Sequence, residues 1–348
     1  MPIYINGRFL TKKLTGIQRY AMEVLKELDK IETDEKIILL QPKEILYDLN
    51  LKNIEIKKIG HLTDNLWEQI SVPLYLFGKK NVKLLNLFNS APILYPGYVT
   101  LHDIAFKTHP GHLTKKFVMW YSFMTRLNIK RYKHIFTVTE FAKKEICDVY
   151  HIDKNKITVT YNSAEHLKGI EEDDSIIKEL KLENKVFCFS LGSRSQHKNH
   201  KYIEECAKRN PDITFVISGG INNLVLKNEK MDDLKNMIYT GYITDNQLVA
   251  LYRHCSCFIF PSLYEGFGIP PLEAITVGCK KVLLSNLDVF KEVYGDSVEY
   301  FDLNGNEDKY NIKAILEDGK EVDYKIVEKY SWKKIAKKIM EKVEEKNE

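Results

Sequence analysis

The sequence lacks the features that mark secreted, membrane-spanning and metal-binding proteins. Its six cysteines include no Cys-x-x-Cys pair, so small buried side chains in a reducing compartment explain them better than disulfides or metal ligands. No apolar run approaches the ~20 residues of a transmembrane helix, and the first residues do not form a signal-peptide pattern. These absences predict a cytoplasmic location.

Asp-x-Asp triplets, which hold a divalent cation in some transferases, are also absent, as are tandem repeats and low-complexity linkers. We therefore expect neither a metal ion nor another cofactor. What is present is an ordinary globular composition, in which 44% of the 348 residues are hydrophobic and 29% are charged. Because this length exceeds what one hydrophobic core usually serves, we expect two domains.

Charge is unevenly distributed along the chain. Residues 1–165 contain 25 Lys and Arg against 17 Asp and Glu, whereas the remainder contains 27 against 31. A basic N-terminal half favours an anionic partner there, such as a lipid surface or a phosphorylated acceptor.

Short apolar runs alternate with amphipathic stretches through both halves, which is typical of doubly wound α/β domains. An acidic stretch, Glu171-Glu-Asp-Asp174, marks a change of composition between the halves. We therefore predict one domain over 1–168, a second over 169–330, and a terminal amphipathic helix over 331–348. The positions expected on the buried face of that helix are Trp332, Ile335, Ile339 and Val343.

The most informative stretch is Pro261-Ser-Leu-Tyr-Glu-Gly-Phe-Gly-Ile-Pro-Pro-Leu-Glu273. An apolar run, Cys257-Phe-Ile-Phe260, precedes it and predicts a short buried strand. Gly266 and Gly268 then predict an irregular loop, and the two prolines that follow are typical of the first turn of a helix. A strand that leads through a glycine loop into a helix places backbone N–H groups where they attract phosphate.

Two carboxylates flank that loop. Glu265 lies before the predicted helix and Glu273 lies in its first turn, and carboxylates accept strong hydrogen bonds from sugar hydroxyls. Either residue alone is explained as well by a solvated loop position or by the helix dipole. Together with the glycine loop, they favour a site that holds a diphosphate between a sugar and a ribose.

This stretch resembles the E-x7-E motif of retaining glycosyltransferases with the GT-B fold, in particular those of glycosyltransferase family 4. The resemblance implies two Rossmann-like doubly wound domains facing across a cleft, with the C-terminal helix crossing back to the first domain. It implies that Glu265 contacts hydroxyls of the donor sugar and that Glu273 contacts the nucleotide ribose. The other donor-binding positions that it implies in this stretch are Gly266, Phe267, Gly268 and Leu272.

A second donor-binding loop is expected after a strand at 186–191. The sequence there continues as Gly192-Ser-Arg-Ser-Gln-His-Lys198, and cations in a loop after a strand suit a diphosphate. The resemblance implies that Lys198 binds the diphosphate, with Ser193 at the arginine position of the family and Arg194 one place later. It also implies that Tyr242 and Ile243, which follow another strand, border the nucleotide base.

Two positions in the N-terminal half complete the predicted site. Gly16 lies where a helix begins, so its backbone can approach a ligand closely, although a plain loop glycine explains it equally well. His102 lies near the end of a strand expected at 98–103, at the edge where open α/β sheets bind ligands. The resemblance implies that Gly16 lies near the donor phosphates and that His102 borders the reacting centre. The predicted catalytic residues are therefore Glu265, His102 and Lys198.

Residues 113–134 combine basic side chains with several aromatic ones, among them Phe117, Trp120 and Phe123. A basic, aromatic helix of this kind can lie on an anionic membrane. It can equally pack on the core with a solvated charged face, so both interpretations stay open.

The residues and the resemblance together predict a metal-independent hexosyltransferase that uses a nucleotide-sugar donor, and the resemblance implies that it retains the anomeric configuration. The acceptor expected is a hydroxyl of a glycan or lipid-linked oligosaccharide. The resemblance implies bacterial surface polysaccharide synthesis at the inner face of the plasma membrane, and we expect no nucleic acid partner. Three alternatives remain open: a GT-B nucleotide-sugar epimerase, a glycan phosphorylase, and a catalytically silent glycan-binding partner subunit.

Overall fold

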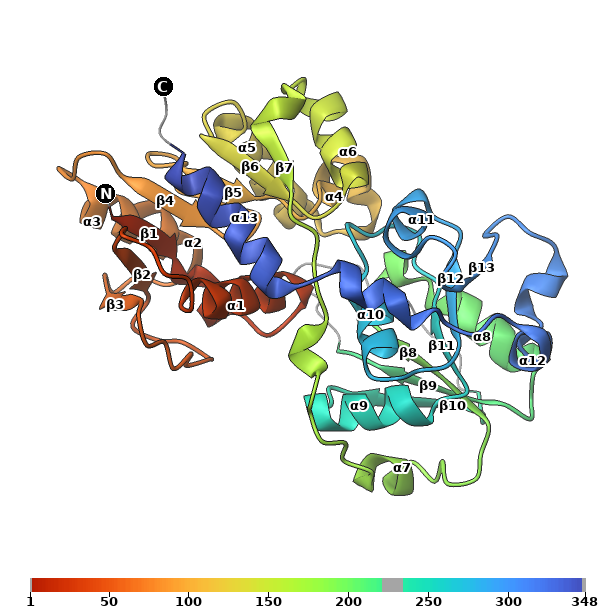
Figure 1. Cartoon of the computed structure of the whole chain (residues 1–348). Helices are drawn as coiled ribbons and strands as arrows, with labels where there is room; N and C mark the ends of the chain where they lie inside the picture. Colours follow the sequence, from red (N-terminus) through yellow and green to blue (C-terminus); the bar gives the residue numbers. More distant parts are fainter. Residues whose placement is uncertain (1, 221–233, 346–348) are drawn as a thin grey trace. The chain divides into compact units, whose positions relative to one another are not determined.

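Two parallel β-sheets, each covered by helices, form the framework of the chain (Figure 1). The computed structural model describes residues 2–220 and 234–345. The first of its two units is Met1–Ile104, Met119–Asn162 and Ser331–Glu348, and the second is Ala105–Val118 with Ser163–Tyr330. The acidic stretch at 171–174 therefore lies inside the second unit, and the division falls between Asn162 and Ser163.

In the first sheet, successive strands are added outward from β1, first on one side and then on the other. Within the described residues its strand order is β3-β2-β1-β4-β5-β6-β7, and every pairing is parallel. The winding reverses between β1 and β4, which creates the kind of switch point at which open α/β sheets bind ligands. The strands are β1 (Ile3–Asn6), β2 (Ile37–Gln41), β3 (Glu55–Lys58), β4 (Lys83–Asn86), β5 (Tyr98–Thr100), β6 (His134–Thr137) and β7 (Ile157–Val159).

The helices of this unit pack through apolar side chains that recur at helical spacing. Figure 1 shows α13 (Trp332–Glu344) beside α1 (Gly16–Leu28), where the ring of Trp332 contacts Tyr20 edge-on. The predicted inner face of α13 is confirmed, since all four of its expected apolar side chains are buried. The other helices of this unit are α2 (Asp64–Leu66), the π-helical turn η2 (Trp67–Ser71), α3 (Val72–Leu76), α6 (Glu140–Tyr150) and α5 (Lys115–Asn128), whose first four residues belong to the second unit.

A buried polar network fixes the switch point of the first sheet. Asn6, at the end of β1, donates its side-chain amide to Asn86 Oδ1 (2.8 Å) at the end of β4 and to Glu68 Oε2 (3.0 Å). The carboxylate of Glu68 also accepts hydrogen bonds from Arg8 Nη1 (3.0 Å) and Ser90 Oγ (2.9 Å). Because the buried carboxylate and guanidinium are paired, the loops after β1 and β4 are held without an uncompensated charge.

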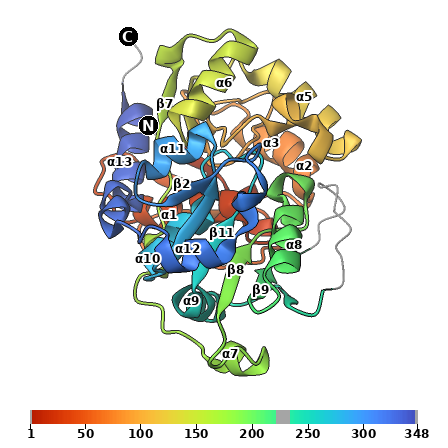
Figure 2. The same ribbon diagram turned by 90° about the vertical axis from the view of Figure 1, so that its right-hand side faces the viewer.

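The second sheet follows the same plan. Its order in the described residues is β10-β9-β8-β11-β12-β13, again parallel throughout, and its switch point lies between β8 and β11. Figure 2 shows β8, β9 and β11 side by side. The strands are β8 (Phe187–Leu191), β9 (Thr214–Ser218), β10 (Met237–Gly241), β11 (Cys257–Phe260), β12 (Val282–Ser285) and β13 (Glu299–Phe301).

Aromatic packing anchors the helices of the second unit to this sheet. Tyr252 of α9 contacts Phe189 of β8 and Phe258 of β11 edge-on, with ring centroids 5.3 and 5.1 Å away.

Among the residues that the structure describes, no helix has the length and apolar composition needed to cross a bilayer. The helices are α4 (Ala105–Thr108), α7 (Ser175–Glu179), α8 (His200–Arg209), α9 (Asp245–His254), α10 (Ile269–Thr276), α11 (Asp288–Tyr294) and α12 (Ile312–Asp318).

Candidate functional site

The loops that follow β8 and β11 leave neighbouring strands at the switch point of the second sheet. The first loop contains Lys198, and the second contains Glu265. Lys198 Nζ lies 2.5 Å from Glu265 Oε1, which also accepts a hydrogen bond from Ser262 Oγ (2.7 Å). The two charged side chains are only 16% and 14% exposed, so solvent screens their attraction weakly. The fold thus joins two predicted catalytic residues that lie 67 positions apart.

Contacts between the two loops hold this pair in place. Leu263 donates its backbone N–H to the carbonyl of His197 (2.7 Å), directly before Lys198. The ammonium of Lys198 also lies over the ring of Phe260, 4.7 Å from its centroid, where a cation is attracted to the aromatic face. The lysine is therefore positioned by the end of β11 as well as by its own loop.

The turn before α10 requires glycine at position 268. Gly268 has φ +84°, and a Cβ there would lie 2.6 Å from Cε1 of Phe290. The hydroxyl of Tyr294 donates to the carbonyl of Gly268 and fixes the turn from the other side. The result is a short loop that passes directly into the N-terminus of α10, as the glycine and proline pattern predicted.

Both carboxylate oxygens of Glu273 are held by neighbouring side chains. His166 Nε2 lies 3.0 Å from Oε1, and Tyr252 donates its hydroxyl to Oε2 (3.1 Å). Burial, reinforced by the charge of Glu273, raises the pKa of Tyr252 well above its ordinary value, so this hydroxyl remains a donor. The carboxylate has a fixed direction and retains lone pairs that can accept hydrogen bonds from ligand hydroxyls.

Ser193 and Arg194, in the loop after β8, belong to the same unit as Lys198 and Glu265. The guanidinium of Arg194 lies over the ring of Tyr239 in β10, 4.4 Å from its centroid. The hydroxyl of Ser193 lies 3.1 Å from that of Ser195. In this arrangement Arg194 packs on an aromatic ring beside the loop, so Lys198 is the cation of this loop that meets the motif glutamate.

The remaining residues predicted to bind the donor differ in how exposed their side chains are. Phe267 and Leu272 are 2% and 1% exposed, so only their backbone atoms can face a ligand, as is also the case for Gly266. Tyr242 and Ile243 follow the carboxyl end of β10, and the Tyr242 side chain is 65% exposed. An exposed ring at this edge is able to stack on a planar group.

Gly16 and His102 belong to the first unit, where Tyr20 connects them. Gly16 begins α1, and Tyr20 one turn later contacts the ring of His102 edge-on, with centroids 4.7 Å apart. Burial lowers the pKa of His102 to about 4, although the carbonyl of Leu87, 3.5 Å from Nε2, opposes that shift. His102 is therefore neutral near pH 7 and offers one N–H donor and one acceptor.

Three residues that hold the two glutamates were missed by sequence reasoning: Ser262, His166 and Tyr252. Ser262 lies inside the motif, three residues before Glu265, so its position was a usable signal. His166 and Tyr252 lie 107 and 21 positions from Glu273, and no local pattern connects them to it. Only the fold brings these groups together.

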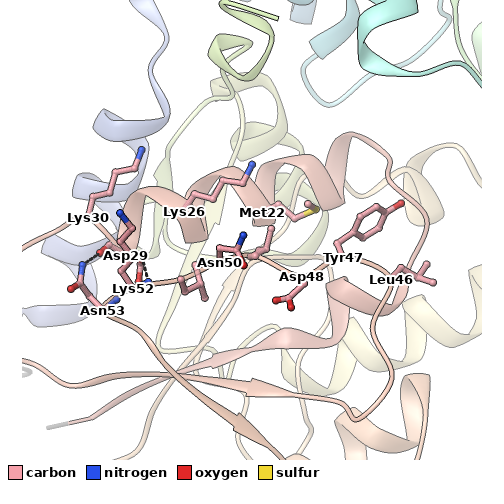
Figure 3. Close-up of a pocket in the computed structure, with 12 residues that line it drawn as sticks. Met22, Lys26, Asp29, Lys30, Leu46, Tyr47, Asp48, Asn50, Lys52 and Asn53 are labelled. Carbon is pink, nitrogen blue, oxygen red and sulfur yellow. Dashed lines mark hydrogen bonds between the residues drawn. The ribbon is translucent and has the colours of Figure 1, made fainter.

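A separate pocket of about 720 Å³ lies in the first unit and is lined by none of the predicted site residues (Figure 3). One wall is the second half of α1, and the other is the loop 46–53. Asp29 anchors the end of this loop, because its carboxylate accepts backbone N–H groups of Lys52 (2.7 Å), Asn53 (2.8 Å) and Ile54 (2.8 Å). Burial alone would raise the pKa of Asp29, but these hydrogen bonds outweigh it and lower that pKa.

The part of the chain that contains these loops matches a known protein family. Residues 171–321 match the family described as "Glycosyl transferases group 1". The matched range includes Lys198, Glu265 and Glu273, together with the whole of the second sheet.

Two curated relatives span most of the chain. The O-antigen chain mannosyltransferase RfbU of Salmonella typhimurium is 27% identical over 314 residues, which cover 85% of each protein. The O-antigen chain mannosyltransferase B of Escherichia coli is 24% identical over 319 residues, which cover 82% of each.

Among solved structures, that of Anabaena Alr3699/HepE in complex with UDP and glucose is similar over 98% of each chain, with a TM-score of 0.70 and 14% sequence identity. At this identity the likeness concerns the fold, which is of the GT-B type with two Rossmann-like parallel-sheet domains.

Proposed function

We propose that this chain, whose residues 171–321 match the family of glycosyl transferases group 1 and whose fold is of the GT-B type, moves a hexose from a nucleotide-diphosphate sugar to a hydroxyl of a glycan or lipid-linked oligosaccharide. In this proposal the anomeric configuration is retained and no metal ion takes part. The observation that carries it is the pair of Lys198 and Glu265, 2.5 Å apart at the switch point of the second sheet.

A cation paired with a carboxylate matches a ligand in which a diphosphate is joined to a sugar. Lys198 exchanges Glu265 for a phosphate oxygen, and Glu265 then accepts hydrogen bonds from sugar hydroxyls. Glu273, held in direction by Tyr252, accepts hydrogen bonds from the ribose. Backbone N–H groups where α10 begins add to the stabilisation of the diphosphate.

The proposed reaction exchanges one C–O bond for another. The bond from the anomeric carbon to the diphosphate oxygen breaks as the acceptor oxygen bonds to that carbon on the same face. The acceptor proton passes to the departing phosphate oxygen, so no covalent enzyme intermediate is needed. Negative charge grows on the leaving diphosphate, where Lys198 stabilises it electrostatically, and we assign neutral His102 to the border of the reacting centre.

Mannose is the first hexose to test, because the two curated relatives that span most of the chain are both O-antigen chain mannosyltransferases. The same names support surface polysaccharide synthesis as the setting, with the enzyme in the cytoplasm. The acceptor would then be a growing glycan or its lipid-linked precursor.

Donor binding is tested first by thermal-shift measurements with GDP-mannose, UDP-glucose and dTDP-glucose. A ligand present at about 100 times its dissociation constant stabilises the native state by ~2.7 kcal/mol, which is readily detected. Glu265→Ala should lose most of the shift, whereas Glu140→Ala, at the start of α6, should keep it.

The reaction is tested by incubating the active donor with and without a mannan-type acceptor. The proposal predicts transfer with the donor's anomeric configuration in the product, as measured by NMR coupling constants. An inverted product would contradict retention. Conversion of the nucleotide sugar to its epimer without acceptor would replace transfer by the epimerase alternative.

We also propose that the first unit contacts an anionic membrane through α5 and the neighbouring helices α2, η2 and α3. No Asp or Glu occurs between Asp103 and Glu140, while seven Lys and Arg do. Gln69 of η2 and Asn128 of α5 both donate to the carbonyl of Ala91, so these helices are neighbours. Together they expose seven large apolar side chains, which we call the docking face: Leu66, Ile70, Leu74, Phe77, Met119, Phe123 and Leu127.

A surface that combines exposed apolar side chains with cations matches the interface of an anionic bilayer. We expect co-sedimentation with vesicles containing phosphatidylglycerol, weakening as salt is raised, and little with phosphatidylcholine alone. Phe77→Ser combined with Phe123→Ser should abolish binding, whereas Leu46→Ser, 58% exposed outside the docking face, should not. Equal binding to both kinds of vesicle would contradict this part of the proposal.

A further inference from the structure

The segment Ala105–Val118 belongs to the second unit although it precedes that unit in the sequence. It contains α4 and the short helical turn η3 (Pro110–His112), and it contributes two histidines, His109 and His112. Sequence reasoning attached no function to either residue, and the proposed reaction so far does not use them.

Ring contacts connect these histidines to both loops of the proposed donor site. His109 packs on Tyr264, the residue before Glu265, with ring centroids 4.2 Å apart. His109 and His112 lie nearly parallel at 6.4 Å, and His112 meets His197, the residue before Lys198, edge-on at 6.2 Å. The three imidazoles therefore form a bridge between the neighbours of Glu265 and of Lys198, which we call the histidine bridge.

The surroundings of the bridge disfavour the charged forms of His197 and His109. Burial lowers the pKa of His197, and the charges of Lys198, His112, His200 and His109 lower it further. Burial followed by the proximity of His112 lowers the pKa of His109. A neutral imidazole carries one N–H donor and one acceptor, and it gains charge only when a nearby anion compensates the cost.

Charges on the elements packed against the bridge are mainly positive. Burial lowers the pKa of His200, at the start of α8, to about 4, and Lys198 and Arg194 contribute to that shift. The carboxylate of Glu265 lies next to these positive charges, because it is paired with Lys198. The segment 105–118 itself contains no Asp or Glu. An incoming diphosphate would therefore meet cations and imidazoles, with one carboxylate that is already paired.

One atom indicates which nitrogen of His112 is the donor. Its Nδ1 is buried and has no hydrogen-bond partner among the described residues. Leaving a buried N–H without a partner is costly, so Nδ1 is best assigned as an acceptor and Nε2 as the N–H donor. Nε2 of His112 is then the ring atom that can donate a hydrogen bond to a ligand.

We propose that His109 and His112 form one wall of the donor-diphosphate site, where both donate hydrogen bonds to the phosphate or sugar oxygens and His109 acquires positive charge as the diphosphate arrives. The inference rests on the proposed function, since it assumes a diphosphate beside Lys198. It extends the site to a segment outside the matched family range of 171–321. A negative ligand favours the protonated imidazole, so donor binding draws a proton from solvent.

The sign of the effect on binding follows from linkage. A group whose pKa rises on binding strengthens binding below its free pKa, and that gain is lost as pH rises through the pKa of the complex. Donor affinity should therefore increase as pH falls through the pKa of the complex and level off below the lowered pKa of free His109, by up to ~tenfold for each unit by which binding raises that pKa. Both phosphates of a nucleotide sugar are diesters and do not titrate in this range, so the donor does not contribute to the change.

The experiment is isothermal titration calorimetry of GDP-mannose, UDP-glucose and dTDP-glucose at several pH values and in buffers of different ionisation enthalpy. Wild-type protein should bind one of them more tightly at lower pH, with proton uptake. His109→Asn combined with His112→Asn keeps hydrogen-bonding groups but cannot titrate, so its affinity should not vary with pH. His254→Asn, an exposed histidine of the same unit, is the matched control and should behave as wild type.

Three results overturn the inference. Affinity that does not depend on pH in wild type removes the proton uptake, and unchanged pH dependence in the double variant assigns it to other groups. Either result leaves the proposed function intact, because the donor has bound. Failure of all three donors to bind wild type overturns the proposed function, and the inference with it.

Discussion

The ammonium of Lys198 lies 2.5 Å from Oε1 of Glu265, in a contact that links the loops after β8 and β11. Each group is the natural partner of a different part of a nucleotide sugar: the cation of a phosphate, and the carboxylate of sugar hydroxyls. In the proposed function the pair separates when the donor binds, and each side chain then exchanges its partner for a group of the ligand.

Replacement of Lys198 by Met should slow transfer by about 100- to 1,000-fold, because it removes a fixed cation from the leaving diphosphate. Glu265→Gln should also impair transfer, and the double variant should lose less than the two single losses combined, since the residues act as a unit. Steady-state kinetics of all three variants measure this. Lys201→Met, at an exposed position of α8, is the matched control. Additive losses would show that the two residues act independently.

Tyr252→Phe removes the hydroxyl that donates to Glu273 Oε2 and leaves the buried ring in place. The carboxylate then has one holding partner, His166, and its direction is less fixed. We expect the KM for the donor to rise by roughly fivefold to tenfold, corresponding to about 1 kcal/mol, with a smaller change in kcat. Tyr324→Phe removes a comparable hydroxyl near Gly278 and should change neither value. A fall in kcat alone would contradict a role in ribose binding.

Chelation should leave transfer unchanged, because the proposed stabilisation of the leaving group comes from Lys198 and backbone N–H groups. In the described part of the chain, the one group of side chains whose ligand atoms lie close enough to share a metal ion is Glu172, Asp174 and His254, all of them exposed. Activity after EDTA treatment and dialysis measures this, with Glu172→Ala as a variant expected to retain activity. Loss of activity that manganese restores would contradict metal independence.

Asp29→Asn should destabilise the first unit by about 2 kcal/mol at pH 7, because it weakens the charge-assisted hydrogen bonds that anchor the loop 46–53. The folded pKa of Asp29 is lowered, so its contribution is complete above the unfolded value of about 3.9 and is lost as pH falls through the folded pKa. The difference between wild type and variant should therefore shrink in acid.

Urea denaturation followed by tryptophan fluorescence measures this difference, since all three tryptophans, Trp67, Trp120 and Trp332, belong to the first unit. Asp48→Asn, at an exposed position of the same loop, is the control and should have little effect. A difference between wild type and Asp29→Asn that stays constant down to pH 3 would mean that the charge of Asp29 contributes nothing.

Local patterns were enough to predict the parts of the fold that depend on neighbouring residues. The apolar run Cys257–Phe260 forms β11, and α10 begins at Ile269, where glycine conformation and the two prolines leave few alternatives. The inner face of α13 follows from its 3.6-residue period in the same way. In each case the physical cause lies within a few residues of its effect.

Contacts that depend on strand order could not be read from the chain. Lys198 meets Glu265 because β8 pairs with β11, and no rule for a single segment predicts that pairing. The same applies to His166 beside Glu273 and to the segment 105–118, which belongs to the second unit. The acidic stretch at 171–174 was interpreted as a boundary, although polar composition marks exposure as well as a change of domain.

The central claim is tested most directly by a crystal structure of the protein with the nucleotide sugar that gives the largest thermal shift. The account predicts a phosphate oxygen about 3 Å from Lys198 Nζ, the hexose hydroxyls on Glu265, and the ribose on Glu273. A nucleotide sugar bound elsewhere, with Lys198 still paired to Glu265, would contradict it.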